Sequence, residues 1–170
     1  MNLQWIGGIL IIAGCGGVGF GMALNYKREE AALRKLYKAL DFMSSELEYR
    51  LTPLPELCRK VAGFSQGSVG AVFRVLAEEL DRQVSPDVSC CMGAALGRVR
   101  DLPGKAGAAL LELGRSLGQF DLEGQVKGIS LVKQLCKKEL EELEANRSQR
   151  IRSYQTLGLC AGAALAILFI

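Results

Sequence analysis

The distribution of charge along the chain constrains the fold more than any single motif does. The chain has 170 residues, with 21 Lys and Arg against 18 Asp and Glu, and all of these side chains lie between Lys27 and Arg152. Both ends are therefore apolar, whereas the middle is polar. This asymmetry predicts that the two ends occupy an environment different from the one around the middle.

The N-terminal run from Leu3 to Leu24 is apolar apart from Gln4. At a rise of ~1.5 Å per residue, a helix of this length would cross a hydrocarbon core of ~30 Å. The alternative is a cleaved secretory signal peptide, which needs a basic segment before the apolar run and a small-residue cleavage site after it. Neither is present, and we predict a retained transmembrane helix over residues 1–25.

The C-terminal run from Thr156 to Ile170 has 15 residues and no charge. The alternative to a membrane segment is an apolar helix docked on a soluble core. A docked helix would have a polar face, and this run is apolar on all sides. We therefore predict a second transmembrane helix over residues 156–170.

Basic residues adjoin the inner edge of each apolar run. Lys27 and Arg28 follow the first run, and Arg150 and Arg152 precede the second. Because positively charged flanks stay in the cytoplasm, we predict that residues 26–155 form a cytoplasmic domain of a membrane protein, with both termini outside.

The middle of the chain has the periodicity of amphipathic helices. Apolar residues recur three and four positions apart, and no stretch alternates with period two. The stripes are Leu33, Leu36, Leu40, Met43 and Leu47, then Val69, Val72, Phe73, Leu76 and Leu80, then Val88, Met92, Ala95, Leu96 and Val99, then Ala106, Ala109, Leu110, Leu113 and Leu117, and finally Leu122, Val126, Ile129, Val132, Cys136, Leu140 and Leu143. We predict an all-α antiparallel bundle of about six helices, whose first and last helices extend as long rods into the membrane segments.

Proline-containing corners separate these helices. In Leu51–Glu56, "LTPLPE", Thr52 is predicted as the N-cap of a helix that begins at Pro53, with Pro55 still in its first turn. A ligand for a proline-reading module would be more proline-rich and more exposed. We interpret this segment as a tight corner inside one domain, and predict similar helix starts near Asp87, Pro103 and Asp121.

No residue pattern indicates catalysis. The chain has no histidine, and its six cysteines lack the paired spacing of a zinc site. Its glycine-rich stretches lack the preceding strand that a phosphate-binding loop requires. Basic residues are scattered rather than gathered in a stripe, which disfavours nucleic acid. We predict a protein that is not an enzyme and has no metal, cofactor or small-molecule substrate.

Three segments together resemble the stage III sporulation protein AB family of endospore-forming bacteria. They are "ELEYRLTPLPE" at 46–56, "LGQFDLEGQ" at 117–125 and "LGLCAGAALAILFI" at 157–170. The motif residues, which we interpret mainly as capping and packing residues, are Glu46, Tyr49, Thr52, Pro53, Leu54, Pro55, Leu117, Gly118, Asp121 and Gln125. Two positions depart from the family pattern: Arg50 replaces the usual glycine, and Met92 a common tryptophan.

The resemblance implies a fold similar to the cytoplasmic domain of the F-type inner-membrane platform proteins of type II secretion systems. It also implies a place in the mother-cell membrane around the forespore, as a platform or assembly component of a channel or secretion-like complex. The implied partners are the ATPase called stage III sporulation protein AA, which would dock on the cytoplasmic side, and other membrane proteins of the same operon. A homo-oligomer is a further expectation.

Two hypotheses remain open at this stage. We hypothesise that Arg50, Arg59 and Lys60 contribute to the surface that docks the ATPase, with ordinary solvated charges as the alternative. The alternative function is a membrane-anchored helical adaptor, or an accessory subunit of a sensor, without a role in secretion.

Overall fold

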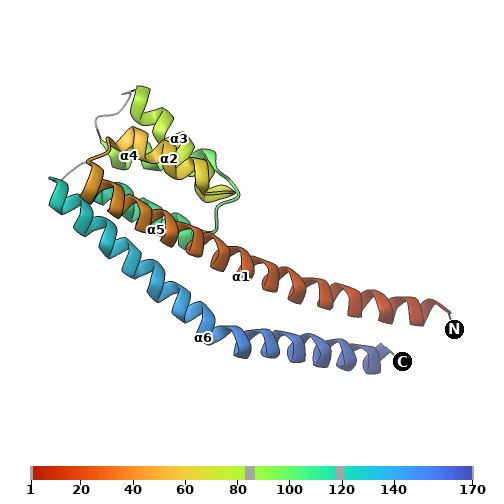
Figure 1. Ribbon diagram of the computed structural model, residues 1–170. Coiled ribbons are helices and arrows are strands. Elements are labelled where there is room, and N and C mark those ends of the chain that lie inside the picture. The colour runs from red at the N-terminus through yellow and green to blue at the C-terminus, as the bar shows by residue number, and fades with distance from the viewer. Residues whose placement is uncertain (1, 83–86, 118–120, 170) are drawn as a thin grey trace. The chain divides into compact units, whose positions relative to one another are not determined.

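Helices make up nearly all of the described chain. The computed structural model describes the backbone of residues 2–82, 87–117 and 121–169, and the side chains of residues 24–82, 87–117 and 121–145. Within these ranges the chain forms six α-helices and no strand, as the sequence predicts (Figure 1). The helices are α1 (Asn2–Arg50), α2 (Leu54–Phe64), α3 (Ser68–Arg82), α4 (Val88–Arg98), α5 (Gly104–Ser116) and α6 (Leu122–Phe169).

The chain divides into two compact units that share the two long helices. The first consists of Met1–Arg28 and Glu141–Ile170, and the second of Glu29–Leu140. In the first unit, the Tyr26 hydroxyl donates a hydrogen bond to the Leu143 carbonyl oxygen at 2.6 Å. The second unit contains the four short helices. Helix α1 continues over 49 residues and α6 over 48, which confirms that the first and last helices are long.

The two predicted membrane segments are helical along their described backbone. Residues 2–25 belong to α1 and residues 156–169 to α6, but nearly all of their side chains lie outside the described part of the chain. Among the residues that are described, no helix has a stretch both long enough and apolar enough to cross a membrane.

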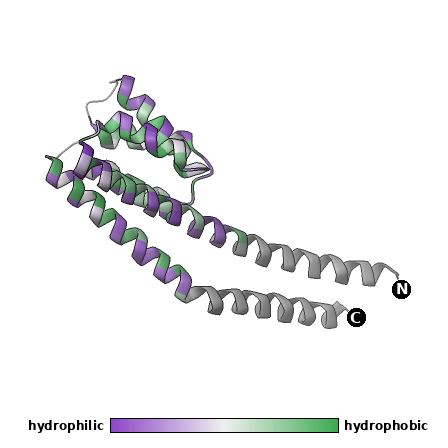
Figure 2. Cartoon of the chain, in the orientation of Figure 1, coloured by the Kyte–Doolittle hydropathy of each residue, from purple (hydrophilic) through white to green (hydrophobic). Residues whose placement is uncertain are grey.

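The core of the second unit consists of the apolar stripes that the periodicity predicts. Hydrophobic and hydrophilic residues alternate along these helices in the helical pattern (Figure 2). The fully buried large side chains are Phe73, Leu33, Leu36, Leu40, Met43, Leu57, Leu76, Met92, Leu110, Leu113, Leu117 and Ile129. Removing these side chains from water is the main driving force for the bundle.

Some stripe residues are only partly buried, namely Leu80, Val88, Leu96, Val99, Val126 and Leu140, and Leu122 departs furthest from the prediction. Leu122 is 41% exposed, although its spacing places it in line with the buried residues of α6. It is the first residue of that helix, at the end of the bundle, where the neighbouring helices stop. Helical periodicity fixes a direction around the axis, but it does not say how far along the axis the neighbours extend.

Helices α4 and α5 begin close to the starts that the sequence predicts. Asp87 is the N-cap of α4, and its side chain accepts a hydrogen bond from the Ser89 N–H at 3.1 Å. Pro103 precedes the first residue of α5. Gly67, in the turn before α3, has a φ of 84°, a left-handed conformation that glycine adopts without the steric cost of a Cβ. These turns allow consecutive short helices to fold back on one another.

Helices α4 and α5 approach so closely that a side chain would not fit at their contact. A Cβ added to Gly114 would lie 2.6 Å from Met92 Cβ and 2.9 Å from Met92 Cγ. Met92 is itself fully buried. Glycine at position 114 therefore sets the distance between the two helices.

We predict opposite effects on stability for two glycine substitutions. Gly114→Ala should lower the free energy of unfolding by about 1–3 kcal/mol, because the added methyl group overpacks the contact with Met92. Gly93→Ala, in the exposed part of α4 with no atom within 4 Å of the added Cβ, should raise it by about 1 kcal/mol through helix propensity. Urea unfolding followed by circular dichroism measures both. Equal effects of the two substitutions would contradict the close approach.

Candidate functional site

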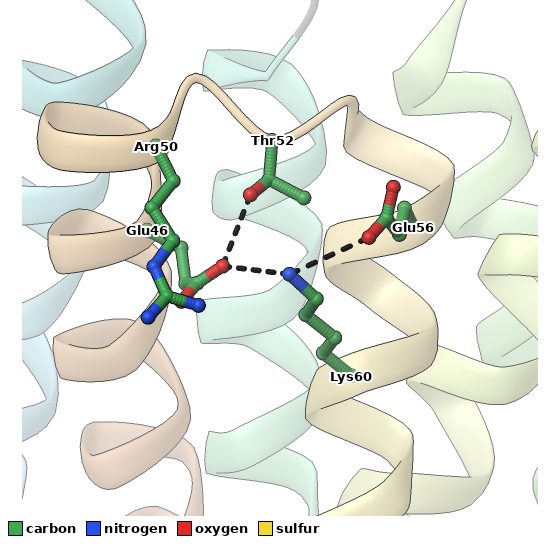
Figure 3. A network of polar contacts seen from close by, with 5 residues as sticks. All are labelled: Glu46, Arg50, Thr52, Glu56 and Lys60. Carbon is green, nitrogen blue, oxygen red and sulfur yellow. Dashed lines mark hydrogen bonds and ion pairs between the residues drawn. The ribbon is translucent and has the colours of Figure 1, made fainter.

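A buried carboxylate joins the end of α1 to the start of α2. The side chain of Glu46 is 9% exposed, and its Oε2 accepts hydrogen bonds from Thr52 Oγ1 at 3.0 Å and Lys60 Nζ at 2.9 Å (Figure 3). The other oxygen, Oε1, lies 3.4 Å from a guanidinium nitrogen of Arg50. Lys60 also pairs with Glu56 at 3.4 Å. The network therefore ties together α1, the connecting segment and α2.

The two central charges of this network stabilise each other. The hydrogen bond from the Lys60 ammonium holds the pKa of Glu46 below its ordinary value of 4.5, against the opposing effect of burial. The same hydrogen bond raises the pKa of Lys60. A largely buried charge that loses its partner is strongly destabilising. The corner should therefore be sensitive to the loss of either group.

The prediction that Thr52 caps a helix beginning at Pro53 is wrong. Helix α2 begins at Leu54, and Pro53 occupies the N-cap position without a side-chain hydrogen bond. Thr52 is buried and donates to Glu46 instead. A hydrogen bond to a carboxylate is stronger than one between neutral groups, which explains why the hydroxyl takes this partner. Pro55 lies in the first turn, as predicted.

Leu51, directly after α1, has an unusual backbone conformation. Its φ is 52°, and no other described residue except Gly67 has a positive φ. A left-handed conformation costs a residue with a Cβ roughly 1–2 kcal/mol. The side chain of Leu51 is 65% exposed, so its packing does not offset this cost.

The second motif lies around the start of α6. Leu117 is the C-cap residue of α5 and is fully buried, and its N–H donates to the Leu113 carbonyl oxygen at 3.0 Å. Asp121 caps α6, since its Oδ1 accepts a hydrogen bond from the Gly124 N–H at 3.0 Å. The Gln125 N–H donates to the Asp121 carbonyl oxygen, also at 3.0 Å. Gly118, which shares this motif, lies outside the described residues.

Antiparallel contacts between α1 and α6 bring the two motifs to the same end of the bundle. Lys133 of α6 forms an ion pair with Asp41 of α1. Leu122 lies eleven residues before Lys133 along α6. Eleven residues beyond Asp41 lead to Thr52. The start of α6 therefore lies beside the end of α1 (Figure 1).

The three cations predicted to dock a partner all form ion pairs within the bundle. Arg50 and Lys60 both pair with Glu46, and Arg59 of α2 pairs with Asp81 of α3. Their docking role remains a prediction. Reversing their charges would break contacts between helices, so a loss of binding in such a variant would not by itself identify a docking surface.

The buried thiols are not suited to nucleophilic chemistry. Burial raises the pKa of Cys58 to about 12 and that of Cys136 to about 11, and it also raises the pKa of Cys91. These three thiols stay protonated at neutral pH, whereas a reactive cysteine is a thiolate. Within the described ranges, no group of three Cys, Asp or Glu side chains is placed to hold a metal ion.

Sequence reasoning missed a second buried carboxylate. Glu79 of α3 is 8% exposed and lies 2.9 Å from a guanidinium nitrogen of Arg98 of α4. Both buried glutamates follow a buried stripe residue by three positions, Glu46 after Met43 and Glu79 after Leu76. This spacing places them on the inner side of their helices and could have indicated buried ion pairs.

Comparisons with known proteins match this chain to a family of sporulation proteins. The family described as stage III sporulation protein AB matches residues 4–170. Stage III sporulation protein AB of Bacillus subtilis (strain 168) is 28% identical over 171 residues, which cover 98% of each chain. A solved structure of a stage III sporulation protein AB superimposes with a TM-score of 0.64 at 22% identity. It covers 72% of this chain and 98% of its own, and at this identity it shows a shared fold.

We predict that Glu46→Gln lowers the thermal midpoint of unfolding, and that the midpoint of this variant changes less with pH than that of the wild type. Because the pKa of Glu46 is depressed in the folded state, its charge stabilises the fold above the unfolded pKa near 4.5. That stabilisation is lost as the pH falls through the lower, folded pKa. Thermal melts between about pH 7 and about pH 3 measure the effect.

Glu56→Gln is the matched control. The side chain of Glu56 is 52% exposed, so removing its ion pair with Lys60 should change stability by no more than about 0.5 kcal/mol. If the Glu46→Gln protein and the wild type lost stability in parallel on acidification, the buried carboxylate would not be the group that holds the corner.

Proposed function

The chain belongs to the stage III sporulation protein AB family, and on that premise we propose that it is a non-enzymatic membrane platform of a sporulation-specific complex. Family membership gives it a role in sporulation. The complex would be a channel or secretion-like assembly in the mother-cell membrane around the forespore. The observation that carries the proposal is a family match over residues 4–170, which includes the helical bundle and both apolar ends.

The two ends of the chain support a membrane anchor. All charged residues lie between Lys27 and Arg152, and the runs outside these limits are apolar. Helices α1 and α6 continue without a break from the bundle into these runs. The basic residues at their inner edges favour a cytoplasmic bundle with both termini outside.

The bundle is suited to mechanical coupling rather than to catalysis. Ion pairs join α6 to its neighbours, between Lys133 and Asp41 and, at 2.7 Å, between Lys105 and Glu139. These contacts tie α6 to α1 and α5 inside the bundle. A platform of this kind would hold a cytoplasmic ATPase in a fixed place on the membrane, and we propose stage III sporulation protein AA as that ATPase.

We predict that the full-length protein co-purifies with this ATPase and with other membrane proteins of its operon. The test is a detergent pull-down from sporulating cells, with mass spectrometry of the bound proteins. Gly93→Ala, which lies away from every predicted contact, should retain the same partners. Recovery of a sensor kinase or receptor in place of the ATPase would favour the adaptor function and contradict the platform.

We also predict that the C-terminus lies outside the cytoplasm. Alkaline phosphatase folds only where its disulfides form, outside the reducing cytoplasm. It should be active when fused after Ile170, beyond the second predicted span, and inactive when fused after Arg152, before that span. Assays of the two fusions in cells measure the orientation, and equal activity of both would show that residues 156–170 do not cross the membrane.

A further inference from the structure

We propose that the end of the bundle where the two motifs meet is a protein-docking surface, and that its partner presents an apolar depression rimmed by lysine or arginine. This inference rests on the proposed function, in which the bundle docks a protein. We call the surface the corner surface. It consists of the apolar residues Tyr49, Leu51 and Leu122 and the acidic residues Glu48, Asp121 and Glu123.

The first observation is the exposure of large apolar side chains at this end. Tyr49 is 83% exposed, Leu51 65% and Leu122 41%. They come from segments some seventy residues apart in sequence, and the antiparallel register of α1 and α6 brings these segments together. Exposed apolar groups that gather in one place mark interaction sites, and tyrosine is enriched in such sites.

The second observation is the backbone of Leu51. The left-handed conformation at φ 52° is one that glycine would adopt without strain, yet the residue is a leucine whose side chain faces solvent. The left-handed turn ends α1 and carries Thr52 inward to Glu46, but the Leu51 side chain contributes nothing to the core. The Glu46 network holds this strained turn in place, and a partner that covers Leu51 would supply the contact that its side chain lacks.

The third observation is the sign of the charge around these residues. Arg50 pairs with Glu46, and Lys60 pairs with both Glu46 and Glu56, so two carboxylates balance these two cations. The three acidic residues of the corner surface are exposed, and no ion pair among the described residues involves them. Lys127, five residues beyond Leu122 on α6, is the nearest exposed cation along that helix.

The charge identifies the class of occupant. A partner with lysine or arginine at its rim complements the three carboxylates, and complementarity of this kind speeds association and excludes wrong partners. Two copies of this chain do not fit corner to corner, because two acidic corner surfaces would repel each other. The occupant is therefore a different protein with a basic rim.

Photo-crosslinking in sporulating cells tests the proposal on the full-length chain. Benzoylphenylalanine is placed at position 49 or 51, and in a matched control at position 131 on α6, where Leu131 is 59% exposed. We expect an adduct from positions 49 and 51 and none from 131. Mass spectrometry should locate the adduct in a partner segment with lysine or arginine beside apolar residues.

Charge variants test the specificity of the adduct. Glu48→Lys combined with Glu123→Lys should reduce its yield at least about tenfold, because two attractive contacts become repulsive. Lys127→Glu should leave the yield unchanged or raise it. An adduct with an acidic segment or with a second copy of this chain would overturn the proposal. So would a yield that the charge reversals do not change, or the absence of an adduct at both positions.

Leu51→Gly separates docking from folding. Glycine relieves the strain at position 51, so the thermal midpoint should stay the same or rise, while the adduct at position 49 should weaken several-fold as the apolar contact is lost. An unchanged adduct yield would show that Leu51 is not part of the surface.

The outcomes also distinguish this proposal from the proposed function. A charge-dependent adduct with a protein other than an ATPase would support the corner surface and contradict ATPase docking there. Recovery of the ATPase in the pull-down, without an adduct at positions 49 and 51, would support the proposed function and overturn the corner surface.

Discussion

The carboxylate of Glu46 is the constraint on which the corner of this bundle depends. It is almost completely buried, and it accepts hydrogen bonds from Thr52 and Lys60 while pairing with Arg50. A charge in this position is tolerated only when it is fully compensated. The requirement fixes the end of α1, the path of the connecting segment and the first turns of α2 at the same time.

The conformation of the neighbouring residues follows from that requirement. Thr52 turns inward to reach the carboxylate, so it is not available to cap α2. The chain makes this turn directly after α1, with Leu51 in the left-handed conformation and its side chain in solvent. The turn at Leu51 and Thr52 therefore has two consequences. It stabilises the corner through Glu46, and it exposes the side chain of Leu51 on the surface that we propose for docking.

Functional interpretation of this chain depends on surfaces rather than on reactive groups. The buried thiols are held protonated by their environment, and Glu46, Arg50 and Lys60 are engaged in ion pairs inside the corner. Hydrophobic burial, buried ion pairs and close helix contacts hold the helices of the bundle in fixed positions. Such a scaffold is suited to holding other proteins in place, as a platform in a sporulation complex would.

The sequence by itself determined the helical class, the number of helices and most of the core, because burial on one side of a helix imposes a three-and-four spacing that is local and can be read directly. Asp87 and Asp121 were predictable for the same reason, since a helix cap involves neighbours in sequence. Only the tertiary structure decided the partner of Thr52, the exposure of Leu122 and the meeting of the two motifs. Each of these depends on which distant residues lie nearby and where neighbouring helices end, and no local spacing contains that information.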